Sequence, residues 1–269
     1  YFQPWTSCPP PREGSFRVPG HPHLARDFWR TVPEEYAHKG LFWWRAVTVA
    51  FLFRVRSDVL EEIAIEEAKK SMDWGPGMIG LHVRRGDSCH TSIRKGRCIP
   101  LSEHITRVRA MSTRYNATRV FVATDSPGVL EGLREAAPEL SFHGTPSGLD
   151  LYGLEATIGE CQRRHRGKQD DGETLSDGCT GNDAWIEHRL GRGSIPAREL
   201  SLATIVDITL LSQCDFFVGH FGSNLSRLAY LLSLSHHGRP VPFSSVDGAW
   251  CYHWRMCCDL RPDGSSFVC

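Results

Sequence analysis

Three groups of polar residues follow short apolar runs, and their side chains suit an anionic ligand. They are His82-Val83-Arg84-Arg85-Gly86-Asp87, Thr124-Asp125-Ser126 and His220-Phe221-Gly222-Ser223-Asn224. Arginine grips phosphate oxygens through two-pronged, charge-assisted hydrogen bonds. The third group opens a helical pattern, so its free backbone N–H groups and the Ser223 hydroxyl can hold an anion. Together the three groups predict a diphosphate clamp assembled from separated segments.

Other interpretations of the same residues are weaker for the three groups taken together, although for a single arginine a structural role is the better explanation. Arginines at strand ends are often solvated or paired with structural carboxylates, and Asp87 and Asp125 could be such partners. The tripeptide at 85–87 matches the integrin-binding signal of adhesion proteins, but here it directly follows a strand of core character instead of standing at a mobile tip. Neither G-x-G-x-x-G nor G-x-x-x-x-G-K-[ST] stands at these positions, which argues against a dinucleotide-binding or P-loop fold.

The elements that must position these groups alternate between strands and helices. We expect strands at 78–83, 119–124, 140–143 and 214–219, and helices at 101–115, 129–136, 199–213 and 223–235. This alternation indicates an α/β fold, a parallel sheet with crossover helices. Ligands bind such sheets at the carboxyl ends of the strands, where the three polar groups lie.

The whole chain divides into three parts. Residues 1–75 form an N-terminal region with a helical pair. Its first helix, "GLFWWRAVTVAFLFRV", is apolar nearly all round, as expected of a helix buried in a core, and Ser57 or Asp58 would cap the second, "VLEEIAIEEAKK". Residues 76–235 form the sheet domain, interrupted by a long polar stretch at 144–198. Residues 236–269 form a Cys-rich tail.

The bulk composition excludes one class of partner and indicates a compartment. The 269 residues carry 31 basic and 31 acidic side chains, so nothing favours bulk binding to nucleic acid. Ten cysteines favour structural disulfides in an oxidising compartment, with Cys89–Cys98 and Cys161–Cys179 as local candidates. A zinc site at Cys251-x-His253-x3-Cys257-Cys258 is the alternative.

Further signals fit a secretory route. Asn116-Ala117-Thr118 is a glycosylation acceptor triplet. No apolar run is long enough to span a membrane. The abrupt start "YFQPWTSC" suggests the luminal fragment of a longer precursor, whose membrane anchor would lie upstream.

The motifs resemble those of a known family. "MIGLHVRRGD" (78–87), "RVFVATDSPGVL" (119–130) and "IVDITLLSQCDFFVGHFGSNLSRLAY" (205–230) are similar to the motif set of the α1,6-fucosyltransferases, which move fucose from GDP-fucose to the innermost GlcNAc of N-glycans. The resemblance implies a GT-B-like glycosyltransferase with a Rossmann-type donor domain. It also implies inversion at the fucose carbon, no metal or other cofactor, and a place in the Golgi or another secretory lumen as part of a type II membrane protein.

The resemblance also assigns roles to single residues. It implies that His82 and Asp207 hold the guanine and that Arg84 holds the β-phosphate, while Arg85 and Asp87 shape the site. Asp125 belongs to the second motif. Ser223 and Asn224 would contact the diphosphate or the sugar.

The sequence departs from the family pattern where the catalytic base is expected. The family places a glutamate shortly after the first motif, but "SCHTSIRKGRC" has Ser92 and no acid. Asp87, His90 or Glu103 could supply the base instead. Ser126 replaces a second acid, and two family cysteines fall on Gly219 and Ser226.

The acceptor side leaves several interpretations open. A peptide O-fucosyltransferase and a catalytically silent GDP-sugar-binding protein of the same fold are the alternatives to the α1,6 enzyme. Trp185 and Trp250 are candidates for stacking on an acceptor sugar, whereas Trp43 and Trp44 fit core packing better.

Overall fold

The computed structural model describes residues 32–63, 65–85, 98–126, 128–145, 190–191, 193, 195–250 and 256–257. Its helices are η1 (Glu34–Lys39, a 3-10 helix), α2 (Gly40–Leu52), α3 (Ser57–Glu62), α4 (Ile65–Ser71), α6 (Leu101–Tyr115), α7 (Gly128–Ala136), α11 (Ala197–Gln213) and α12 (Asn224–His237). Its strands are β1 (Ile79–Val83), β2 (Arg119–Thr124), β3 (Ser141–His143), β4 (Phe216–Gly219), β5 (Phe243–Ser245), β6 (Ala249–Trp250) and β7 (Met256–Cys257).

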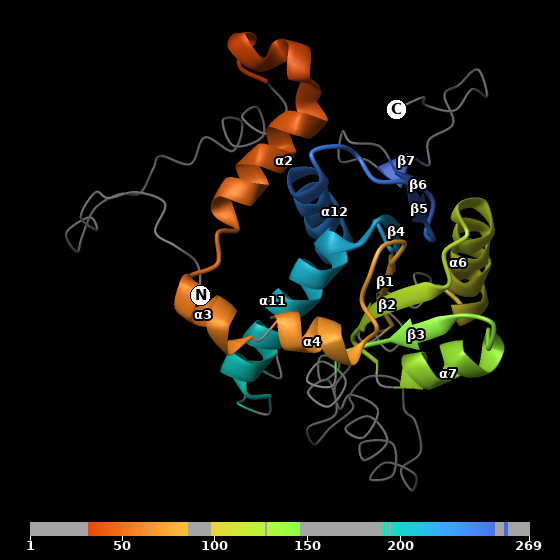
Figure 1. The fold of residues 1–269 in the computed structure, drawn as a ribbon. Coiled ribbons are helices and arrows are strands. Elements are labelled where there is room, and N and C mark those ends of the chain that lie inside the picture. Colours follow the sequence, from red (N-terminus) through yellow and green to blue (C-terminus); the bar gives the residue numbers. More distant parts are fainter. Residues whose placement is uncertain are drawn as a thin grey trace, which may run out of the picture.

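The main sheet is parallel and has the order β3-β2-β1-β4-β5 (Figure 1). From β1 the chain builds outward through β2 and β3, then crosses back to add β4 and β5 on the other side. The strand order therefore reverses between β1 and β4, and such a reversal opens a crevice at the carboxyl ends of the two strands. The predicted α/β fold with a Rossmann-type parallel sheet is confirmed. The sheet also extends past the expected domain boundary at residue 235, because β5 pairs with β4.

Helices cover both faces of the sheet, and the alternation of side chains along β1 explains why. Ile79, Leu81 and Val83 pack with residues of α6 and α7 on one face. Gly80 points to the other face, where an added Cβ would lie 3.1 Å from Cys214 Sγ. The absence of a side chain at Gly80 thus lets α11 and the chain after it lie close against the strand.

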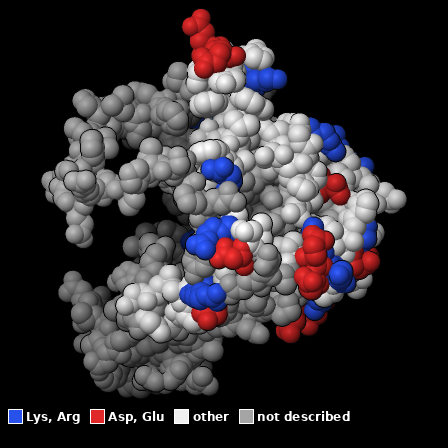
Figure 2. Space-filling view, turned by 60° about the vertical axis from the view of Figure 1, so that its left-hand side comes forward, with Lys and Arg blue, Asp and Glu red and all other residues white. Residues whose placement is uncertain are grey.

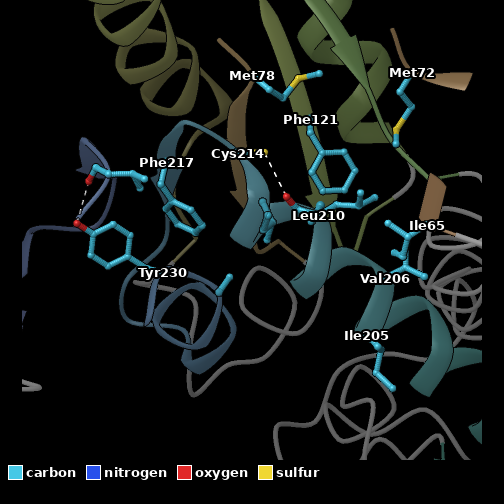
Figure 3. Packing of buried hydrophobic residues seen from close by; sticks show 14 of the residues in the cluster. Ile65, Met72, Met78, Phe121, Ile205, Val206, Leu210, Cys214, Phe217 and Tyr230 are labelled. Carbon is cyan, nitrogen blue, oxygen red and sulfur yellow. Dashed lines mark hydrogen bonds between the residues drawn. The ribbon is translucent and has the colours of Figure 1, made fainter. Parts of the chain in front are cut away.

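The core between the sheet and α11 is large and contains a buried thiol (Figure 3). Phe121, Phe217 and Leu210 are fully buried there, beside Cys214. The Cys214 thiol donates a hydrogen bond to the carbonyl of Leu210 at 3.4 Å, and burial raises its pKa well above the ordinary value. Cys214 is free, whereas Cys98 is disulfide-bonded. The expected partner Cys89 lies outside the described residues, as do Cys161 and Cys179, so both pairings stay predictions.

The α2 helix is not buried all round, so that prediction is wrong. Only Arg45, Ala46 and Val49 of this helix are buried. Ala46 and Val49 pack with residues of α11 and α12, and α2 lies on the outside of the helical layer (Figure 1), where a helix needs only one apolar stripe. Trp43 packs partly into this cluster, and both Trp43 and Trp44 lie 5.7 Å from the ring of Tyr36.

The second helix of the expected pair is divided into α3 and α4. Ile63 and Ile65 both enter the core cluster. In one unbroken helix they would point about 200° apart, so the division lets both be buried. Neither Ser57 nor Asp58 caps the helix, since α3 starts after Arg56 and Asp58 pairs with the Arg56 guanidinium at 2.8 Å.

The charged surface agrees with the neutral net charge. On the face shown in Figure 2, acidic and basic side chains lie in small mixed groups instead of one basic expanse. This face offers no broad surface for nucleic acid.

Candidate active site at the strand-order reversal

His82, near the end of β1, is held against α12. Its side chain is buried, and its Nδ1 lies 2.6 Å from the hydroxyl oxygen of Ser226. Burial, followed by the nearby His220 and Arg84, lowers the pKa of His82 to about 3. The imidazole is therefore neutral at physiological pH, which suits hydrogen bonding to an uncharged base.

The positions of the two family cysteines lie next to each other. A Cβ added at Gly219 would be 2.8 Å from Ser226 Oγ and 2.6 Å from Cε1 of Phe217. The place where a disulfide is expected in the family thus holds the hydrogen bond between Ser226 and His82.

We expect Gly219→Ala to destabilise the fold by about 1–3 kcal/mol, because the new methyl group must displace either the Phe217 ring or the Ser226 hydroxyl. Chemical denaturation measures the change in the free energy of unfolding. Gly191→Ala is the matched control, since a Cβ at Gly191 meets nothing within 4 Å. Equal stability of the two variants would contradict the tight contact.

Both arginines after β1 are half-buried at the same edge of the sheet. The backbone N–H of Arg85 donates to Asp125 Oδ1 at 2.8 Å, so the residue after β2 fixes the main chain that follows β1. Arg84 is close enough to His82, and Arg85 to His104, to lower the pKa of each imidazole. The structure therefore places Arg84, Arg85 and Asp125 at one edge of the sheet, and their role as a diphosphate clamp stays a prediction.

The turn from β4 to α12 is fastened on both sides by side chains. Asp247 accepts hydrogen bonds from the N–H groups of Phe221 (2.9 Å) and Gly222 (2.7 Å). Arg227 donates to the carbonyls of the same two residues, at 2.7 Å and 3.0 Å. The prediction that the N–H groups of this turn are free for phosphate is therefore wrong for Phe221 and Gly222, because a carboxylate from the β5–β6 connection already occupies them.

Ser223 is the part of this turn that stays available. It is the N-cap of α12 but makes no capping bond, and its buried hydroxyl oxygen has no partner among the described residues. A serine at this position ordinarily bonds to an N–H in the first helical turn. Here the hydroxyl and those N–H groups are left for another acceptor, and a helix start of this kind favours an anion.

Two further histidines, His220 and His104, lie on the α6 side of the same edge of the sheet. His220 Nε2 is 2.9 Å from Asp247 Oδ2, and both side chains are 7% exposed. Burial acts to raise the pKa of Asp247, but hydrogen bonds from His220, Gly222 and Ser245 outweigh it and lower that pKa. His104, fully buried in α6, donates from Nδ1 to the carbonyl of Pro100 at 3.1 Å. Burial lowers the pKa of His104 to about 4.

Asp207 lies in α11 with a buried carboxyl group. Thr145, just after β3, donates to its Oδ1 at 3.1 Å. Burial raises the pKa of Asp207 to about 7, against the weaker lowering effect of that hydrogen bond. His82 and Asp207 are thus held by different partners, Ser226 and Thr145, and a shared role at the guanine stays a prediction.

The remaining candidates are spread out. Glu103 is exposed in the first turn of α6, and Asn224 is exposed at the start of α12. Asp87, His90 and Trp185 lie outside the described residues. Trp250 is not a platform for an acceptor sugar: it is 5% exposed and packs against Phe221 with ring centroids 4.5 Å apart.

Sequence reasoning missed Asp247 and His104, and it included His220 only within a longer segment. The apolar run before Ser245 was the available signal, because it marks a further strand whose end would carry polar residues. For His104 there was no such signal, because the pattern of an amphipathic helix does not show whether a histidine lies at the surface or in the core.

Within the described residues, no three His, Cys, Asp or Glu side chains are arranged to hold a metal ion. Most of the zinc alternative in the tail lies outside them. Nor is any described helix long and apolar enough to cross a membrane.

Comparisons with known proteins agree with the motifs. The family model of the α-(1,6)-fucosyltransferase N- and catalytic domains matches residues 26–154. An α-(1,6)-fucosyltransferase of Drosophila melanogaster is 23% identical over 235 residues, covering 82% of this chain and 31% of the relative. The chain thus spans less than a third of that relative's length.

Two solved structures are similar as well. The NodZ α-1,6-fucosyltransferase co-crystallised with GDP is 20% identical, with a TM-score of 0.39, covering 68% of this chain and 45% of that one. POFUT1 in complex with GDP is 12% identical, with a TM-score of 0.42, covering 77% of this chain and 51% of that one. With the family model and the fruit-fly relative, the resemblance drawn from the motifs is confirmed: this chain is similar to the α-(1,6)-fucosyltransferases.

Proposed function

We propose that this chain is the donor-binding part of an inverting glycosyltransferase that moves fucose from GDP-fucose to a hydroxyl of a glycan acceptor. The unpartnered, buried hydroxyl of Ser223 at the start of α12 carries the proposal. It lies where the strand order reverses, and Arg84 and Arg85 follow the neighbouring strand. A polar atom left without a partner inside a protein is costly, so a ligand oxygen is the natural occupant.

The chemistry required of these groups is charge stabilisation. As the bond between fucose and the β-phosphate breaks, negative charge builds up on the departing GDP. A guanidinium from the end of β1 and the hydroxyl and N–H groups at the start of α12 would neutralise it without a metal ion. The neutral His82 and the carboxyl group of Asp207 would bind the guanine.

The acceptor is proposed from the relatives. The matched family and the fruit-fly relative are α-(1,6)-fucosyltransferases, which favours α1,6 transfer. The core GlcNAc of N-glycans is the acceptor that the motif resemblance implies. The nearest alternative enzyme is a peptide O-fucosyltransferase, which would transfer fucose to a peptide hydroxyl. The exposed Asn116 in its acceptor triplet favours a secretory lumen.

Addition of GDP is expected to stabilise the protein by about 2.7 kcal/mol at a concentration one hundred times its Kd. For a chain of this size that raises the Tm by about 5–10 °C. A thermal-shift series with GDP, GDP-fucose and ADP measures it, with ADP as the control for the base. If neither GDP nor GDP-fucose shifted the Tm, the proposal that GDP-fucose is the donor would be refuted.

A silent binding protein is distinguished by turnover. It would show the same thermal shift with GDP-fucose, but it would release no fucose and transfer none to N-glycan or peptide acceptors. The missing glutamate after the first motif is the reason to run both assays on one preparation.

A further inference from the structure

His220 carries a ring nitrogen that no described residue occupies. Its Nδ1 is buried and unpartnered, while Nε2 lies 2.9 Å from Asp247 Oδ2. An ionised carboxylate only accepts hydrogen bonds, so in the neutral ring Nε2 carries the hydrogen. Nδ1 is then left with its lone pair and can accept a proton.

Asp247 is held firmly enough to fix that tautomer. Besides His220, it accepts hydrogen bonds from Phe221 N–H, from Gly222 N–H and from the Ser245 hydroxyl at 2.9 Å. A carboxylate anchored in this way orients an imidazole and stabilises the positive charge that the ring gains with a proton.

The position of His220 places it at the proposed donor site. It directly follows β4 and begins the turn that ends at Ser223. Each packed element also brings charged or titratable groups near it. His82 of β1 and His104 of α6 interact electrostatically with His220, and Asp247 comes from the β5–β6 connection. Arg84 and Arg85, after β1, interact in turn with His82 and His104.

We infer that His220 is the proton acceptor of the transfer reaction, in place of the glutamate missing after the first motif; this inference rests on the proposed function. The acceptor hydroxyl gives its proton to His220 Nδ1 as its oxygen bonds to the fucose anomeric carbon. The bond from that carbon to the β-phosphate oxygen breaks, and its electron pair leaves with GDP. Asp247 acts through His220 and is a positioning residue.

Of the other residues considered as the base, Asp87 and His90 lie outside the described residues. Glu103 is described, and it is exposed in the first turn of α6. An acid there suits the helix dipole without any catalytic role. His220 is instead built into the edge where the donor would sit.

His220→Gln tests the inference, because the glutamine amide can keep the Nε2 bond to Asp247 but has no basic nitrogen. Hydrolysis of GDP-fucose is the readout, since water then serves as the acceptor and no glycan has to be guessed. We expect hydrolysis to fall by about 10²- to 10⁴-fold, the usual contribution of a general base. The thermal shift with GDP should stay as in the unaltered protein.

The GDP shift separates a base from a structural role, because His220→Gln should lose hydrolysis without losing that shift. His220→Asn is the matched variant: its amide replaces Nδ1 and gives up the bond to Asp247, so the turn loosens and the GDP shift itself should shrink.

The possible results bear separately on the inference and on the proposed function. Hydrolysis by His220→Gln within about threefold of the unaltered rate overturns the inference alone. A chain that binds GDP-fucose but neither hydrolyses it nor transfers its fucose overturns both the inference and the proposed transferase activity. A chain that binds neither GDP nor GDP-fucose overturns the proposed function instead.

Discussion

Arg84→Ala is expected to reduce fucosyl transfer by at least about 10³-fold while the protein stays folded. Removing one donor to developing charge in an active site typically costs about 10²–10³ in rate, and this donor carries a full charge as well. Arg84 follows β1 directly, on the strand next to the one that leads to Ser223. Kinetics with GDP-fucose and a core N-glycan acceptor give the size of the effect.

Two further variants make the result specific. Arg84→Lys keeps the charge but not the fork of donors, so it should recover only part of the rate. Arg107→Ala removes an equal charge from an exposed site on α6 and should leave the rate unchanged. Near-normal transfer by Arg84→Ala would refute the clamp.

Asp207→Asn is expected to stabilise the protein at alkaline pH and to weaken GDP binding at the same time. Burial raises the pKa of Asp207 to about 7 from an ordinary 3.8. The folded state therefore binds the proton more tightly than the unfolded state, and the carboxyl group lowers the free energy of unfolding progressively as the pH rises from 4 to 7. The neutral amide avoids this cost, which is on the order of 4 kcal/mol at most.

The stability difference between Asp207→Asn and the unaltered protein should thus grow across that pH range and level off above it. Denaturant titrations at several pH values measure it, with Glu67→Gln on the exposed surface of α4 as the control for loss of one charge. A difference that does not change with pH would show that Asp207 is not the titrating group.

The histidines act in the opposite direction over nearly the same range. The pKa values of His82 and His104 are lowered to about 3 and about 4, so their contribution to stability is complete above pH 6.5 and is lost as the pH falls below it. In the unaltered protein Asp207 offsets part of this loss. Asp207→Asn should therefore be the more acid-sensitive protein, with a steeper fall in stability below pH 6.5.

The sheet and its helices could be predicted from the sequence because their patterns are local. The run 119–124 agrees with β2 because it is a short continuous apolar stretch, and the helix 101–115 agrees with α6 because its apolar residues repeat at the helical period. The α3–α4 break and the exposed face of α2 could not be predicted in this way. Both depend on which neighbour each side chain meets, as Ile63 and Ile65 show.

The candidate site, too, could be predicted from the sequence only where its residues follow a local pattern. Arg84, Asp125 and Ser223 stand directly after strands, so the rule for parallel sheets found them. Asp247 escaped it because its role comes from hydrogen bonds to Phe221 and Gly222, made across a gap in the chain. These hydrogen bonds also occupy two N–H groups that the sequence predicted to be free for phosphate.

The fastening of the β4–α12 turn by Asp247 also constrains the order in which the protein can mature during synthesis. His82 and Ser226 are 144 residues apart, so they meet only after the long polar stretch has left the ribosome. Closing such long loops is slow, and the carboxylate that fixes the turn emerges later still. A nascent chain that ends before Asp247 would already hold the strands β1 to β4 but not a fixed donor site, so the ability to bind GDP should be acquired among the last events of folding.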